Sequence, residues 1–197
     1  MGPEVFIFMI SMNCQLDFDP DFWSGFDTAM MEEWNIAVTT SCHEVEDHYP
    51  SNLYAYKSLA SRLLLADATT TTSNSTTAIA EQATNDFTIY INSILGEGQF
   101  DVRGEEKQVV FLTEYSDRVF LKPTASGVAY PTENLAFVKN NFEYSTAATS
   151  HEILHLVLEA EGYEKSCYAD AVHENQFKYE LEDMGGNKYP VMKKFDC

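Results

Sequence analysis

The segment from Ser145 to Glu161 constrains this chain more than any other part of its sequence. It contains no proline and no glycine, so nothing in it interrupts a helix. Apolar residues lie nearly all round the helix that it would form, which is typical of a helix that is largely buried; they are Ile153, Leu154, Leu156, Val157 and Leu158. We therefore predict a buried helix over 145–161.

Two of the five histidines of the chain lie in this segment, in the run His151-Glu152-Ile153-Leu154-His155, which reads H-E-x-x-H. Residues four apart share one helix face, so His151 and His155 project side by side. Two neutral imidazoles at this spacing can bind one Zn²⁺ at about 2.0–2.1 Å. Glu152 is rotated by roughly 100° from His151, which suits a general base better than a ligand. The pattern favours a metal site over a pair of hydrogen-bonded helix histidines.

The H-E-x-x-H helix resembles that of the zincin class of zinc metallopeptidases. The resemblance is strong over 151–155, extends over 145–186 and is not visible in 1–100. It implies that His151 and His155 bind Zn²⁺, that Glu152 polarises the attacking water, and that a third protein ligand leaves the fourth position open. It also implies a zincin-like domain that hydrolyses peptide bonds in a peptide or protein substrate. The alternative is a zincin-fold module that binds zinc without catalysis and serves in interaction or regulation.

The third ligand has three candidates, Glu161, His173 and Glu174. The metzincin subclass has a third ligand six residues after the second histidine and a glycine before it, in H-E-x-x-H-x-x-G-x-x-H. Here Leu158 stands at the glycine position, and Gly162 is typical of a helix C′ residue. We therefore expect the helix to continue to Glu161 and to carry this side chain away from the metal.

A second helix is predicted over Ala169–Met184, closed by Gly185-Gly186. Its apolar stripe would consist of Val172, Phe177, Leu181 and Met184. A helix–loop–helix connection would bring His173 or Glu174 towards the metal, and the gluzincin subclass supplies a glutamate from such a helix. The pattern also resembles small H-E-x-x-H proteins of bacteria and viruses. We favour His173 as the third ligand, because it lies nearer the apolar stripe. The alternative is that His173 is a partly buried helix histidine that binds no metal.

Composition excludes several classes of function. The chain of 197 residues has 31 acidic against 12 basic residues and a net charge of −19, which disfavours binding to nucleic acid or to an anionic membrane surface. No phosphate-binding glycine loop and no G-x-S-x-G nucleophile motif is present. The longest apolar run near the start, 5–10, is too short for membrane insertion and lacks the pattern of a signal peptide. We expect a soluble protein, with compartment and oligomeric state left open.

The four cysteines, Cys14, Cys42, Cys167 and Cys197, contain no C-x-x-C pair. Two disulfides in any of three pairings, or free buried thiols, are both compatible with the sequence. A role for Cys167 at the metal is disfavoured, because metal-binding cysteines usually occur in closely spaced pairs.

The remaining patterns predict one α+β domain over 1–197, with a small, mostly antiparallel sheet packed on helices. Asp19-Pro20 is a good start for a helix over 20–35. The other predicted elements are a strand at 5–12, helices at 53–66 and 78–95, an exposed polar loop at 69–77 and strands at 108–113, 118–121 and 135–138. By the zincin resemblance, 118–121 or 135–138 would be the edge strand that borders the cleft. Tyr163, Tyr168 and Tyr189 are candidates to stabilise an oxyanion.

Overall fold

The computed structural model describes residues 3–11, 13–44, 108–113, 126–131, 134–139, 145–184 and 187–197. The predicted helices at 53–66 and 78–95, the polar loop at 69–77 and the strand at 118–121 lie outside these ranges. The described residues belong to one compact unit, and the single domain over 1–197 stays a prediction.

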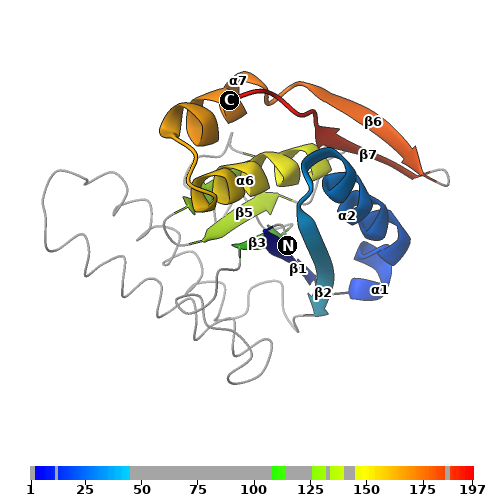
Figure 1. Cartoon of the computed structure of the whole chain (residues 1–197). Helices are drawn as coiled ribbons and strands as arrows, with labels where there is room; N and C mark the ends of the chain where they lie inside the picture. Colours follow the sequence, from blue (N-terminus) through cyan, green and yellow to red (C-terminus); the bar gives the residue numbers. More distant parts are fainter. Residues whose placement is uncertain are drawn as a thin grey trace, which may run out of the picture. The chain divides into compact units, whose positions relative to one another are not determined.

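A five-stranded sheet with helices packed against it forms the centre of this unit, a mixed α/β arrangement (Figure 1). Its strands, in spatial order, are β2 (Ala37–Glu44), β1 (Glu4–Ser11), β3 (Gln108–Thr113), β5 (Leu135–Lys139) and β4 (Gly127–Tyr130). β1 is parallel to β2 and β3, and β3 is parallel to β5. Only β4 is antiparallel to its neighbour. The prediction of a mostly antiparallel sheet is therefore wrong.

The error has a physical cause in the connections between strands. Parallel strands need a crossover connection, and helix α2 (Pro20–Trp34) lies in the crossover from β1 to β2. The inner strand β1 has an unbroken apolar run, Val5 to Ile10, which is typical of a parallel strand covered on both faces. β3, Gln108–Thr113, lies between β1 and β5 and is parallel to both.

The edge of the sheet nearest the H-E-x-x-H helix also differs from the prediction. The strand predicted at 135–138 exists as β5, yet it lies inside the sheet between β3 and β4. Among the described strands the edge is β4, Gly127–Tyr130, which is not one of the predicted strands. A strand this short, containing a glycine, has too little periodicity to be recognised from its residues alone.

Helix α2 begins and ends as its sequence predicts. The Asp19 side chain accepts hydrogen bonds from the backbone N–H groups of Asp21 and Phe22, and Pro20 occupies the first turn. The buried face of the helix contains Trp23, Phe26, Ala29 and Met30. It ends at Asn35, whose φ of 55° is left-handed. The helix packs against β2 and β7 (Asn187–Met192).

Helix α6 (Ser145–Ala160) confirms the helix predicted over 145–161. It packs against β3, β4 and β5, and nearly all of its side chains are buried. It ends in a Schellman motif: the N–H of Gly162 donates to the carbonyl of Glu159 at 2.9 Å, and that of Tyr163 donates to Leu158 at 3.0 Å. Gly162 has a φ of 84°, as expected of a C′ glycine.

The second helix is much shorter than predicted. A π-helical turn, η2 (Ser166–Ala171), leads into α7 (Val172–Glu174), and the chain then forms an antiparallel hairpin of β6 (Tyr179–Met184) and β7 (Asn187–Met192). Phe177, assigned to the apolar stripe of a helix, is 82% exposed. The prediction is wrong because a Gly-Gly pair does not distinguish the end of a helix from the connection of a hairpin. Gly185-Gly186 stands between two strands that pair with each other.

Both disulfides that the cysteine count allows are present. Cys14–Cys42 joins α1 (Cys14–Asp17) to β2, and Cys167–Cys197 joins η2 to the last residue of the chain. None of the helices in the described ranges has the length and apolar character needed to cross a membrane.

Candidate metal site

The two histidines of the H-E-x-x-H motif lie side by side on α6, as their spacing predicts. Both are buried, each with 8% of its surface exposed. The Nε2 atoms of His151 and His155 are 3.0 Å apart, and the ring centroids are 4.6 Å apart. Two nitrogens bound to one tetrahedral Zn²⁺ at about 2.0–2.1 Å would lie roughly 3.3–3.4 Å apart, so this pair is already close to the required separation.

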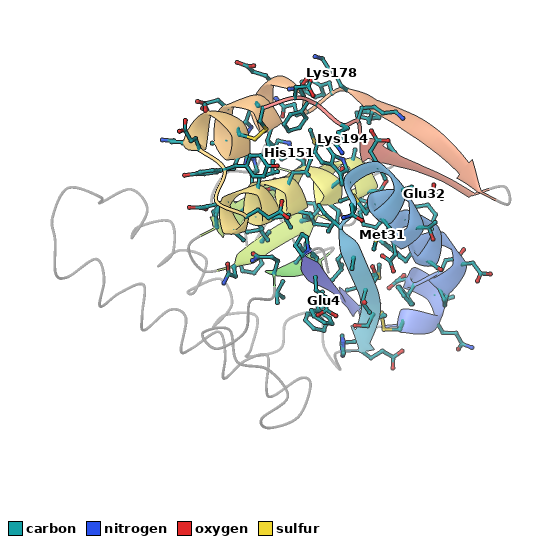
Figure 2. The ribbon with its side chains drawn as sticks, viewed as in Figure 1. Glu4, Met31, Glu32, His151, Lys178 and Lys194 are labelled. Carbon is teal, nitrogen blue, oxygen red and sulfur yellow. A yellow bond between two sulfur atoms is a disulfide. The ribbon has the colours of Figure 1, made fainter. Side chains whose placement is uncertain are left out.

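A third histidine, His173, approaches the same point from α7. Its ring centroid lies 5.0 Å from that of His151 and 4.7 Å from that of His155. One ring nitrogen of each of the three histidines lies within 4.8 Å of those of the others. Figure 2 shows His151 projecting from α6 towards the segment that contains η2 and α7. His173, unlike the other two, is exposed to solvent.

The ring of His155 is oriented by the backbone of η2. Its Nδ1 lies 2.6 Å from the carbonyl oxygen of Tyr168. A carbonyl only accepts, so Nδ1 is protonated and the neutral ring presents the lone pair of Nε2 to the cluster. A hydrogen bond from the second ring nitrogen to a backbone carbonyl is a common way to fix a metal-binding histidine.

Burial keeps the two α6 histidines neutral. Desolvation lowers the pKa of His151 to about 3, with smaller contributions from the neighbouring His155 and His173. It lowers the pKa of His155 to about 4, although the Tyr168 carbonyl opposes this shift. Neutral imidazole is the form that binds a metal ion.

The residues present therefore fit a zinc ion. The Nδ1 atom of His151 is buried and has no hydrogen-bond partner among the described residues. The other ring nitrogen, Nε2, lies towards the histidine cluster, 3.0 Å from Nε2 of His155. The other two candidate ligands are not part of the cluster: Glu161 and Glu174 are both exposed, one beyond the end of α6 and one in α7. Cys167 is held in its disulfide. Metal binding by His151, His155 and His173 stays a prediction.

The side chain of Glu152 lies against strand β4 of the sheet. It is 5% exposed, and burial raises the pKa of its carboxyl group to about 8. Strand β4 passes directly against it: a Cβ atom added to Gly127 would lie 2.7 Å from Glu152 Oε1 and 2.8 Å from its Cγ. Only glycine leaves room for this carboxylate. The signal was present in the sequence, because a glycine within a strand often marks a close approach of another group.

The three tyrosines considered for an oxyanion contact are not assembled around the histidines. Tyr163 is 47% exposed after the end of α6. Tyr168 contributes its backbone carbonyl to the site. The side chain of Tyr189 lies outside the described part of the structure. Stabilisation of an oxyanion by any of them stays untested.

Comparison with known proteins gives one structural likeness. No protein-family model matches the chain. No curated protein matches it either. Among solved structures, the chain is similar to the crystal structure of archaemetzincin from Methanopyrus kandleri, at 12% sequence identity and a TM-score of 0.38, over 87% of this chain and 94% of that one. At that score and identity the likeness establishes neither the fold nor the activity of this chain.

Proposed function

We propose that this chain is a zinc-dependent metallopeptidase. The observation that carries the proposal is the convergence of His151, His155 and His173, with Glu152 adjacent to the first of them in the sequence. Three histidine ligands on a zinc ion leave one position open, which is the composition of a catalytic site rather than of a closed structural one. The assignment of zinc rests on the all-imidazole donor set.

Each residue then has a distinct role. His151, His155 and His173 would hold the ion, which supplies a Lewis acid and lowers the pKa of a water molecule to about 7. In its ionised form, Glu152 would accept the proton of the attacking water and pass it to the amine that leaves. Its burial against Gly127 restricts the carboxylate to a small range of positions. The Tyr168 carbonyl holds His155 in the tautomer that a metal requires.

The substrate class follows from the edge strand. Among the strands that the structure describes, β4 lies at the edge of the sheet, and its Gly127 lies against Glu152. The outer edge of an antiparallel strand can bind an extended peptide as one more strand through backbone hydrogen bonds. We infer that a peptide or an unfolded protein segment binds along β4, which would bring a backbone carbonyl near Glu152.

The test is hydrolysis of an unstructured protein such as casein and of a mixed peptide panel, with and without a chelator. We expect cleavage that the chelator stops and zinc restores, with about one Zn²⁺ per chain in the active protein. Glu152→Gln should bind zinc normally and lose about 10²–10⁴-fold in turnover, the usual range for a general base. Stoichiometric zinc without any cleavage would favour the non-catalytic binding module.

A further inference from the structure

The third histidine, His173, lies in a segment with few buried side chains. Between the end of α6 and the start of β6, residues 161–178 have two buried side chains, Cys167 and Val172. The same segment supplies two groups to the candidate metal site, the carbonyl of Tyr168 and the ring of His173. Few buried contacts make a segment easy to open locally. Something outside the segment must therefore hold these two groups near α6.

The C-terminal residues 193–197, here named the strap, contact this segment near both of its ends. At one end the disulfide joins Cys197 to Cys167, next to Tyr168. At the other end the backbone N–H of Lys193 donates to the carbonyl of Lys178 at 2.8 Å. The groups that face the metal site lie between these two attachments.

The strap is itself anchored on helix α2, outside the site. The ring of Phe195 packs edge-on against Trp34, with centroids 5.1 Å apart. The backbone N–H of Lys194 donates to Glu33 Oε1 at 2.6 Å, and Lys193 Nζ lies 3.6 Å from Glu33 Oε2. A continuous set of contacts thus runs from α2 through the strap and the disulfide to the carbonyl that orients His155.

We propose that the strap and its Cys167–Cys197 disulfide position Tyr168 and His173 for metal binding, so that zinc affinity depends on the disulfide. The inference rests on the proposed zinc site. The backbone positions of His151 and His155 need no such support, because α6 is held by the sheet. Disulfides form in oxidising compartments, and the site would be completed only where this one has formed.

The second disulfide, Cys14–Cys42, provides a control for the removal of Cys167–Cys197. Cys14–Cys42 closes a loop of nearly the same length, with a sequence separation of 28 against 30 for Cys167–Cys197. Loop length sets the chain-entropy part of disulfide stabilisation, so that part is almost equal for the two bonds. Cys14–Cys42 joins α1 to β2, and neither element contributes a residue to the histidine cluster. Loss of either bond should lower stability, but only one should alter zinc binding.

The experiment compares the zinc dissociation constants of the full chain, Cys197→Ser and Cys14→Ser by competition with a chromophoric chelator. We expect Cys197→Ser to bind zinc about 10–100-fold more weakly, the usual loss when a group that orients a ligand is removed. Cys14→Ser should stay within about twofold of the full chain, since its bond lies outside the shell of groups that orient the ligands. The absorption of bound Co²⁺ should change in Cys197→Ser alone, because only there does the ligand set rearrange.

Two further variants exclude simpler explanations. Cys167→Ala/Cys197→Ser removes the thiol that could bind zinc in place of His173, with Cys14→Ser/Cys42→Ser as its matched control. Phe195→Ala keeps both disulfides and loosens the strap from Trp34, so it should weaken zinc binding in the same direction. Equal zinc affinities across the strap variants and their controls would overturn the role of the strap and leave the zinc site standing. A full chain that binds no zinc would overturn both.

Discussion

Helix α6 and the segment 161–178 both contribute histidines to the candidate metal site, but α6 is held by the core and the segment is mostly exposed. α6 is buried along nearly its whole length, packs on β7 and on three strands of the five-stranded sheet, and ends in a Schellman motif. Residues 161–178 are mostly exposed and contain a π-helical turn followed by a single α-helical turn. The core thus determines the positions of His151, Glu152 and His155. His173 depends on contacts made by a distant part of the chain.

This difference explains why the H-E-x-x-H motif is easy to recognise in the sequence, whereas the structure of the segment that contains His173 is not. The spacing within H-E-x-x-H needs only an α-helix, so a buried helix is enough to align two histidines. The third histidine arrives through a π-helical turn, which adds a residue to the turn and re-aims the side chains that follow. Such turns are frequent at functional sites.

The largest expected effect comes from removing the exposed histidine. His173→Ala should weaken zinc binding by more than about 100-fold, because loss of a ligand exceeds the 10–100-fold typical of a supporting group. Glu174→Ala, one residue away and exposed, is the matched control and should bind zinc normally, as should Glu161→Ala. Chelator competition measures all three. Loss of zinc in Glu161→Ala instead would place the third ligand at the end of α6 and remove the contrast between the two regions.

The next largest effect is expected from Gly127→Ala, which tests whether strand β4 fixes the position of the Glu152 side chain. Gly127→Ala would put a methyl group 2.7 Å from Glu152 Oε1, so the carboxylate must shift. We expect turnover to fall by up to about 100-fold, the effect of a displacement near 1 Å, with zinc affinity unchanged. Steady-state kinetics beside zinc titration separates the two quantities. Unchanged turnover would mean that Glu152 acts from another position, or not at all.

A smaller effect, on stability, is expected at Gly162, which lies between α6 and the rest of the segment 161–178. Gly162 has a φ of 84°, and no atom lies within 4 Å of a Cβ added there. Gly162→Ala should therefore cost about 1–2 kcal/mol of stability through the left-handed backbone alone. Thermal or urea unfolding measures this cost. If the loss is much larger, or if zinc affinity falls as well, the boundary contributes to the position of His173 and the two regions are coupled.

The smallest effect concerns the scaffold away from the site. Burial raises the pKa of Asp27 on α2 to about 6 from an ordinary value of 3.8, against the opposing hydrogen bonds of Thr40. Between these two values the folded state keeps a proton that the unfolded state has lost, so stability falls as pH rises from about 4 to about 6. Because the group is partly exposed, we expect a change of about 1 kcal/mol.

The matched variant for this effect is Asp27→Asn, which can still accept the hydrogen bond from Thr40. It should lack this part of the pH dependence and be more stable than the unmodified chain at pH 7. Urea unfolding at several pH values provides the comparison. An unchanged slope in Asp27→Asn would assign the pH dependence to other groups.

The sequence by itself determined the features that depend on neighbouring residues. The cap formed by Asp19 and Pro20, the extent of α6, its end at Gly162 and the alignment of His151 with His155 all follow from spacings of a few residues. His173 lies in the histidine cluster, although the long helix on which it was predicted is wrong, and its role as a metal ligand stays a prediction.

Only the tertiary structure decided which distant segments meet. The parallel strand order, the pairing of Cys167 with Cys197, the contact of Gly127 with Glu152 and the strap across 161–178 each join residues far apart in the chain. No local pattern specifies such contacts. They are set by how the whole chain buries its apolar surface and satisfies its backbone, and those are properties of the folded state rather than of any one segment.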